Sequence, residues 1–232
     1  MLTEWYLERW RVQLSFLDDD PELSVRPINN KDAHHLILNV HYAGRLPSIS
    51  YAFGLFRDGE NVGIVTYGKP SAAPQRTGVC GKDLANYVLE LNRLCLRDNL
   101  KNEASYLVAA SLKLLPQPSI VISYADPQQG HVGYIYQATN FLYCGLTAKR
   151  TEWKIKGFEH LHSQTIADRY RGCDKPSESI RAEHGDDFYL KDRPRKHRYV
   201  YFTGNKRDKK RLKRELRYPT QEYPKNDQKN GP

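Results

Sequence analysis

The stretch Ser119-Ile120-Val121-Ile122-Ser123-Tyr124-Ala125 decides the fold. It is a nearly continuous apolar run of strand length, which is typical of a central strand that is covered on both faces of its sheet. Asp126-Pro127 ends the run, because a proline has no N–H to donate to a neighbouring strand. We therefore expect a buried central strand over 119–125 with a loop directly after it.

The sequence on both sides of this strand alternates between strand and helix patterns. Residues 50–70 contain two alternating apolar runs around Asp58-Gly59, the strongest short signal for a hairpin. Residues 99–115 are rich in alanine and leucine and end at Pro116, as expected of a helix. The other expected elements are a helix over 5–17, a strand over 23–28, a helix over 31–42 capped by Asn30, a helix over 82–92, a strand over 91–96, a helix over 131–141, strands over 141–146 and 196–202, and a basic helix or tail over 206–217.

The order of these elements predicts the fold class. Strand–helix alternation argues for a mixed α/β sheet. A helix, a long hairpin and then β-α-β-α-β-β is the layout of the N-acetyltransferase-like (GNAT) fold. We predict an α/β (α+β) protein with a GNAT-like N-acyltransferase fold, in which helices flank a mixed central sheet, with an insertion and a basic C-terminal extension. The expected division is an N-terminal helical extension (1–22), a catalytic core (23–152), a polar insertion (153–195), and the last strand with a basic DNA-binding tail (196–232).

Composition and missing motifs exclude several classes. The mean hydropathy is −0.73, and no apolar run approaches the ~20 residues that a membrane span needs. The stretch MLTEWYLERWRVQLSF at 1–16 lacks the regions of a signal peptide, and none of the 4 cysteines forms a CxxC pair. No GxSxG, Walker, HExxH or DPPY motif occurs, which argues against common hydrolases, nucleotidases, metalloproteases and amino-methyltransferases. We expect a cytoplasmic protein with reduced thiols and no membrane contact.

Positive charge is concentrated near the C-terminus. Residues 193–232 carry 14 Lys or Arg against 4 Asp or Glu, a net charge of +10, whereas residues 1–192 carry 22 against 23, a net charge of −1. Such a strip is typical of a nucleic-acid-binding surface, although a solubilising tail has the same composition. The interleaved tyrosines 199, 201, 218 and 223 favour nucleic acid, since tyrosine adds little to solubility. We expect a chain cut after Phe202 to keep a folded core, because all the predicted strands precede that point.

Asp126 and Tyr136 are the candidate catalytic residues. Asp126 follows the central strand, and ligands of α/β sheets gather at the carboxyl ends of strands. Tyr136 lies within the next helix and could act as a general acid toward a leaving group. A turn-capping role for Asp126 and core packing of Tyr136 remain the structural alternatives.

Two further sites are suggested by position. In a GNAT fold, a glycine-rich loop before the central helix binds the donor pyrophosphate through backbone amides. Residues 93–105 contain no glycine, so Asn102 and Ser105 are the candidate donors there, with plain helix capping as the alternative. His41, Tyr42 and Asp126 form a plausible nitrogen and oxygen ligand set for a ferrous ion.

One long run carries a family resemblance. SYADPQQGHVGYIYQATNFLYCG at 123–145 resembles the signature of the Mom family, bacteriophage proteins that modify adenine in DNA. Glu90–Leu94, Asn102–Ser105 and Lys196–Tyr199 also resemble that family, and the likeness covers about residues 35–225.

The resemblance implies a GNAT-like enzyme that transfers a methylcarbamoyl group to N6 of adenine and so protects phage DNA from restriction. It implies that Asp126 acts with His41 and Tyr42 around iron, Fe(II), and that Ser105 and Tyr136 serve an acyl donor. The glycine-free loop leaves two donors open, acetyl-CoA and an aminoacyl or glycyl carrier. The implied partner is double-stranded DNA in the host bacterial cytoplasm. The oligomeric state stays open, with a homodimer as one alternative.

An enzyme of this kind must extrude a paired adenine and hold it between apolar or aromatic walls. Phe141, Tyr143 and Tyr134 are available as walls, and the Asn140 amide could read the adenine edge. The cations expected to hold the flanking phosphates are Lys196, Arg198, Lys206, Arg207, Lys209, Lys210, Arg211 and Lys213.

Two other classes remain open at this stage. One is a non-enzymatic DNA-binding module on a GNAT core, and the other is an N-acyltransferase of proteins or small molecules with an incidental basic tail. A modified nucleoside in cellular DNA would distinguish the enzyme from both.

Overall fold

The computed structural model describes residues 23–40, 45–161 and 163–225. The helix expected over 5–17 and the pair His41-Tyr42 lie outside these residues. The chain forms two compact units. The larger unit contains the described residues of 1–123 with 133–144 and 199–223, and the smaller unit contains 124–132, the described residues of 145–198, and 224–225.

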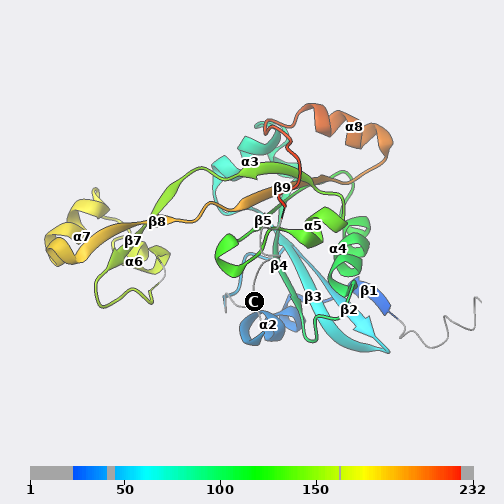
Figure 1. Cartoon of the computed structure of the whole chain (residues 1–232), viewed down its shortest axis with the longest axis horizontal. Coiled ribbons are helices and arrows are strands. Elements are labelled where there is room, and N and C mark those ends of the chain that lie inside the picture. The colour runs from blue at the N-terminus through cyan, green and yellow to red at the C-terminus, as the bar shows by residue number, and fades with distance from the viewer. Residues whose placement is uncertain (1–22, 41–44, 162, 226–232) are drawn as a thin grey trace, which may run out of the picture. The chain divides into compact units, whose positions relative to one another are not determined.

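A seven-stranded sheet is the main element of the fold, with the strand order β1-β2-β3-β4-β5-β9-β6 (Figure 1). Strands β1 to β4 pair antiparallel, whereas β4 and β5 are parallel, so the sheet is mixed as predicted. The strands are β1 (Leu23–Pro27), β2 (Tyr51–Arg57), β3 (Glu60–Gly68), β4 (Val88–Leu96), β5 (Ile120–Ala125), β6 (Leu142–Leu146) and β9 (His197–Phe202).

Two predictions about this sheet are confirmed. Strand β5 is almost wholly buried and lies between β4 and β9, as the apolar run required. Asp58 and Gly59 join β2 to β3 with φ values of 50° and 83°. A two-residue hairpin turn of this kind needs positive φ at both positions, which aspartate and glycine tolerate.

Helices cover both faces of the sheet. On one face, α2 (Asn30–Asn39) packs its Ala33, Leu36 and Ile37 against a cluster that includes Ile64 of β3. On the other face lies α4 (Glu103–Leu114), whose Ser111 Oγ is 2.7 Å from the Tyr67 hydroxyl of β3. Ile64 and Tyr67 are an odd number of residues apart on one strand, so their side chains point to opposite faces.

The sequence placed two helical features wrongly. The helix expected over 82–92 is absent; a short 3₁₀ turn (Ala85–Tyr87) leads into β4, and α3 (Ala73–Cys80) precedes it. Strand β4 is covered on both faces, so its Val88, Leu89 and Leu91 are all buried. Apolar residues at these positions match the spacing of one face of a helix as well. The cap of α2 is Asn29 rather than Asn30, and its backbone N–H donates to Asp32 Oδ2 at 3.3 Å.

The smaller unit contains a second, two-stranded sheet of β7 (Arg150–Ile155) and β8 (Phe188–Arg193). Helices α6 (Ser163–Arg169) and α7 (Pro176–His184) complete this unit with its own apolar cluster of Ile155, Ile166, Tyr170, Ile180 and Phe188. The sequence suggested only a polar insertion over 153–195, because so few apolar residues build this cluster. The expected domain boundaries stay a prediction.

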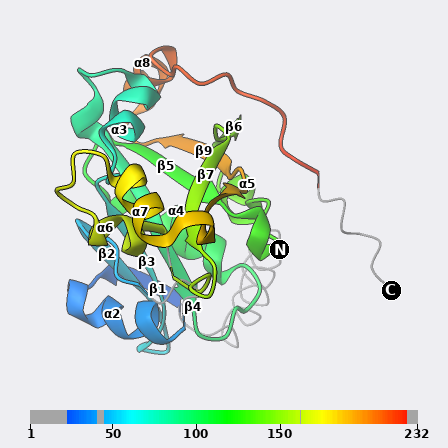
Figure 2. The same cartoon turned by 90° about the vertical axis from the view of Figure 1, so that its left-hand side faces the viewer.

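The segment after β9 packs onto the larger unit. Helix α8 (Lys206–Arg214) lies beside α3 in both views (Figures 1 and 2), and its Leu212 is 0% exposed. Farther along, the Arg217 N–H donates to the Val79 carbonyl at 2.9 Å, and the Gln221 N–H donates to the Tyr143 carbonyl at 2.9 Å. The expectation of a separable core ending at Phe202 is therefore corrected, because residues beyond it supply core and backbone contacts.

Two further observations concern solvent and membrane. Cys80, Cys95 and Cys144 are buried and Cys173 is exposed, and no disulfide joins any of them within the described residues. Burial raises the pKa of the Cys80 thiol to about 12.

Among the described residues, each helix is either too short or too polar to cross a bilayer.

Candidate active site

Asp126 follows directly on β5 and belongs to the smaller unit. Its Oδ2 lies 2.8 Å from the Lys196 ammonium, and the two side chains are 13% and 29% exposed. Its Oδ1 accepts a hydrogen bond from the Gln128 N–H at 3.1 Å. The carboxylate is thus held from both sides at the carboxyl end of the central strand, and both its turn-capping contact and its partner Lys196 are present.

The environment keeps Asp126 ionised. Burial alone would raise the pKa of this carboxyl group, but the hydrogen bond and charge of Lys196, the Gln128 N–H and the charge of Arg193 outweigh it, and the net pKa is lowered. A carboxylate with a lowered pKa is a strong hydrogen-bond acceptor but a weak proton acceptor in the ground state. It therefore suits the orientation of an amine better than early proton abstraction.

The described residues do not fit iron at Asp126. Both carboxylate oxygens are already engaged, one of them by a cationic ammonium that would repel a metal ion. Within the described residues there is no group of three or more His, Cys, Asp or Glu able to hold a metal. The expected ligands His41 and Tyr42 lie outside these residues, so the ferrous site stays a prediction.

Tyr136 lies in α5 (Tyr134–Ala138) and belongs to an aromatic cluster of the larger unit. Its ring centroid lies 5.3 Å from that of Phe141 and 5.2 Å from that of Tyr199. Tyr143 packs on the other side of Tyr199 at 5.2 Å. Tyr199 is completely buried, and burial raises its pKa to about 12, so it serves as the centre of this cluster rather than as a nucleic-acid contact.

Two of the expected aromatic walls are enclosed. Phe141 is 0% and Tyr143 is 7% exposed, so neither presents an open ring face for a base in this structure. Tyr134, in contrast, is 55% exposed. The assignment of Phe141 and Tyr143 to base binding stays a prediction.

Gly133 explains one glycine of the GHVGY run. It caps α5 with φ of 89°, and a Cβ built there would lie 2.4 Å from the Tyr199 ring. A side chain at this position would therefore push against the centre of the aromatic cluster.

Replacing Gly133 by alanine should lower the free energy of unfolding by about 2–4 kcal/mol, from left-handed strain plus displacement of Tyr199. Gly130 is the matched control, since its φ is 68° but no atom of the described residues lies within 4 Å of its Cβ position. Gly130→Ala should cost only the conformational part, about 1 kcal/mol. Urea denaturation measures the free energy of unfolding of both variants. Equal decreases would show that the contact with Tyr199 does not contribute to stability.

The start of α4 is where a coenzyme A pyrophosphate would bind in a GNAT fold. Asn102 is the N-cap residue of this helix with φ of 68°, but its side chain makes no capping hydrogen bond among the described residues. The Ser105 hydroxyl donates to the Asn102 carbonyl at 2.9 Å, so it does not cap a helix N–H either. Glu103 is 3% exposed; its Oε1 accepts hydrogen bonds from Arg57 Nε and Nη2 at 3.0 and 2.7 Å.

These residues do not fit a pyrophosphate. Arg57 is already shared between Glu103 and Asp98, so its charge is neutralised within the protein. Glu103 Oε2 is buried and has no hydrogen-bond partner among the described residues. A buried carboxylate at a helix start occupies the place where an anionic ligand would gain most from the helix dipole.

The expected phosphate-binding residues separate into two groups. Lys206, Arg207, Lys209, Lys210, Arg211 and Lys213 are all exposed on α8, which carries seven basic residues against Asp208. Lys196 is instead paired with Asp126, and Arg198 is half-buried in the smaller unit. Sequence reasoning had no signal for the Lys196 pairing, which joins two segments far apart in the chain.

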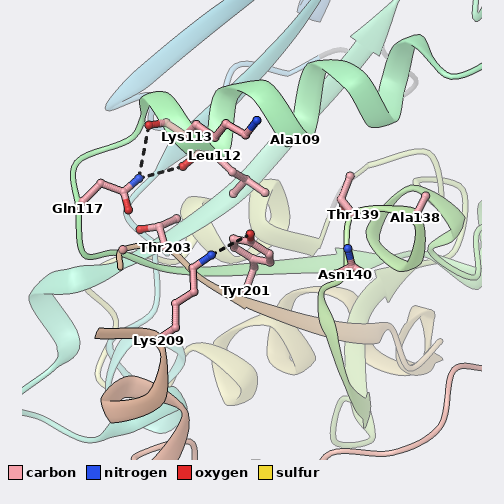
Figure 3. A pocket seen from close by; sticks show the side chains of 11 residues that line it. Ala109, Leu112, Lys113, Gln117, Ala138, Thr139, Asn140, Tyr201, Thr203 and Lys209 are labelled. Carbon is pink, nitrogen blue, oxygen red and sulfur yellow. Dashed lines mark hydrogen bonds between the residues drawn. The ribbon is translucent and has the colours of Figure 1, made fainter. Parts of the chain in front are cut away.

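Asn140 and Lys209 both line a pocket of the larger unit that the sequence did not suggest. The pocket has a volume of about 320 Å³. Figure 3 shows α4 side chains on one side, Tyr201 and Lys209 on another, and Asn140 beside the end of α5.

The mixed sheet with helices on both faces defines the fold class as GNAT-like, as the sequence predicted. Low-level structural similarity extends to a GNAT-family acetyltransferase of Bacillus cereus, with 11% identity, a TM-score of 0.41, and coverage of 79% of this chain and 99% of the other. A probable acetyltransferase of Staphylococcus epidermidis gives 12% identity, a TM-score of 0.43, and coverage of 78% and 99%.

The chain belongs to the Mom protein family, whose match spans residues 22–225. It is 30% identical over 213 residues to the methylcarbamoylase Mom of Escherichia phage Mu, and the alignment covers 88% of this chain and 84% of that protein. The family predicted from the 123–145 run is thereby confirmed.

Proposed function

We propose that this enzyme transfers a methylcarbamoyl group to N6 of adenine in double-stranded DNA, in the host bacterial cytoplasm, and thereby protects that DNA from restriction. The observation that carries the proposal is the relationship to a methylcarbamoylase along nearly the whole chain. The basic face of α8 supports DNA as the partner.

Asp126 orients the adenine amine in this proposal. The N6 lone pair is delocalised into the ring, so the amine is a poor nucleophile. An ionised carboxylate accepts a hydrogen bond from N6–H and raises the electron density at nitrogen. As the bond from N6 to the transferred carbon forms, the N6 proton becomes acidic and passes to Asp126, while Lys196 holds the carboxylate in place.

Tyr136 supplies the second half of the proton transfer. Its hydroxyl gives a proton to the leaving group of the donor as the bond between carrier and transferred group breaks. The cluster around Tyr199 holds the Tyr136 ring in one orientation, which is what a general acid requires.

The donor in this proposal is an aminoacyl or glycyl carrier rather than acetyl-CoA. Attack of N6 on a glycyl carbonyl breaks the bond to the carrier and gives the N6-glycyl isomer of the product, so an isomerisation that adds or removes no atoms must follow to give the methylcarbamoyl group. The buried Glu103 and the neutralised Arg57 at the start of α4 support this choice, because they offer no positive site for a pyrophosphate.

Nucleoside mass spectrometry of plasmid DNA tests reaction and substrate together. DNA from cells that express the protein should contain a methylcarbamoyl-modified deoxyadenosine, and DNA from cells without it should not. Unmodified DNA alongside folded, expressed protein would contradict the proposal, and acylated protein or metabolite in its place would identify a different N-acyltransferase.

The basic face of α8 should dominate the salt dependence of DNA binding. If four to six of its cations each neutralise one phosphate, log affinity should fall against log salt with a slope of about −4 to −5. Replacing Lys206 and Lys210 together by alanine should flatten the slope by about 2 and weaken all sequences equally. Fluorescence anisotropy on a labelled duplex at several salt concentrations measures this.

The matched control removes two exposed lysines elsewhere on the larger unit, Lys31 and Lys82. This control should keep the slope of the unmodified protein. An unchanged slope in the Lys206 and Lys210 variant would show that α8 does not meet DNA phosphates.

A further inference from the structure

The pocket beside α8 lies within the larger unit, next to the start of β5. Gln117 and Thr203 line it, and the Thr203 N–H donates to the carbonyl of Ser119, immediately before β5 begins at Ile120. Asp126 follows the other end of the same strand. The proposed reaction therefore leaves this pocket without a function.

Cationic side chains line the pocket without any carboxylate. Lys113 reaches it from the last turn of α4, and Lys209 reaches it from α8. Among the described residues that line the pocket, these two lysines are the only charged ones. The charges of both lysines therefore favour an anionic ligand in this pocket.

The negative end of α4 is shielded from this pocket. The last carbonyls of a helix carry partial negative charge and would repel an anion. Gln117 Nε2 donates to the carbonyls of Leu112 and Leu115, each at 3.2 Å. The Gln117 amide thus reduces the repulsion that these carbonyl groups would exert on an anion in the pocket.

An aromatic ring lies next to the charges. The Tyr201 ring is half-buried and is supported by Phe141 at a centroid distance of 5.1 Å. Lys209 Nζ lies 5.3 Å from the centre of the same ring and 3.4 Å from the Tyr201 hydroxyl. The exposed amide of Asn140, held in the left-handed region at φ of 61°, completes the polar lining.

We propose that this pocket is a second ligand site, which binds a nucleotide through its phosphate on Lys113 and Lys209 and its base on Tyr201. A volume of about 320 Å³ is at the lower end of the range for small-molecule sites, as a mononucleotide requires. Base stacking on an aromatic ring tolerates any base, and the Asn140 amide offers hydrogen bonds to the base edge. The site goes beyond the proposed transfer reaction and does not depend on it.

The test uses 2-aminopurine deoxyribonucleoside 5′-monophosphate as the probe, because its fluorescence is quenched when its base stacks. Titration of the full chain should quench the probe saturably. The same nucleoside without its phosphate should bind about tenfold more weakly. Absence of saturable quenching at millimolar concentrations of protein would overturn the proposal.

Variants distinguish specific binding in the pocket from nonspecific attraction by the positive charge of α8. Lys113→Ala and Lys209→Ala should each weaken binding about tenfold, whereas Arg214→Ala, which removes a charge from α8 outside the pocket, should change it less than about twofold. Tyr201→Leu should weaken binding about tenfold, and Tyr201→Phe, which keeps the ring, should restore it. Equal effects of Lys209→Ala and Arg214→Ala, or no effect of Tyr201→Leu, would overturn the proposal.

A competition arm identifies the source of the nucleotide. Displacement of the probe by a short duplex would show that the site holds one nucleotide of a DNA strand. Retention of the probe alongside bound duplex would show that it takes a free nucleotide. Because neither arm contains an acyl donor, the outcome is independent of whether DNA becomes modified.

Discussion

Asp126→Asn should abolish modification of DNA while the protein stays folded. Asparagine keeps the oxygen that accepts the Gln128 N–H, so the turn after β5 should survive. It loses the negative charge that pairs with Lys196 and that would attract the adenine amine. The modified nucleoside should fall by at least ~100-fold, the usual size of such a contribution, as measured by mass spectrometry of plasmid DNA, and the melting temperature should move by only a few degrees.

The matched control is Asp174→Asn, which removes the same charge from an exposed position of the smaller unit and should leave modification intact. Duplex affinity should also be unchanged in Asp126→Asn, because the phosphate contacts in our proposal are made by the cations of α8. Full modification by Asp126→Asn would remove this residue from the mechanism. A collapse of folding would show that its role is to cap the turn.

Truncation after Phe202 should unfold the larger unit or leave it without cooperative melting. The cut removes Leu212, which is 0% exposed, and whose burial contributes about 2 kcal/mol. It also removes the backbone hydrogen bonds to Val79 and Tyr143 and the Tyr223 hydroxyl that donates to the Phe141 carbonyl at 2.8 Å, each worth about 1 kcal/mol. A typical domain has only about 5–15 kcal/mol of stability, so these losses together are large.

Circular dichroism during urea denaturation measures the effect. A chain cut after Lys225 keeps every one of these contacts and serves as the control. If the shorter chain melts cooperatively at the same urea concentration as the control, the segment after β9 contributes nothing to the fold. In that case α8 is the separable tail that its composition suggests.

Local signals were sufficient for much of the fold. The hairpin at Asp58-Gly59 depends on backbone conformations that few residue types adopt. Strand β5 could be predicted because its apolar run lacks the alternation of a half-buried strand. Helix α4 follows from composition and a terminating proline. The smaller unit was not predicted because its cluster consists of five apolar side chains that lie far apart in the sequence. Periodicity within one segment cannot reveal such a cluster.

The candidate site was only partly predictable. Asp126 could be located because it follows a recognisable central strand. Its pairing with Lys196, the enclosure of Phe141, and the meeting of Asn140 with Lys209 depend on tertiary contacts between segments far apart in the chain. A single sequence contains no signal for such contacts.

The distribution of thiols makes the protein selectively labelable without mutation. Three of its four cysteines are enclosed, and burial raises the thiol pKa of Cys80 and Cys95, so few thiolates are available there to react. Maleimides and disulfide-exchange reagents should therefore attach at Cys173, on the smaller unit. Duplexes that carry a tethered thiol at successive positions could then be cross-linked to this residue, and the positions that react would map which stretch of DNA the smaller unit approaches.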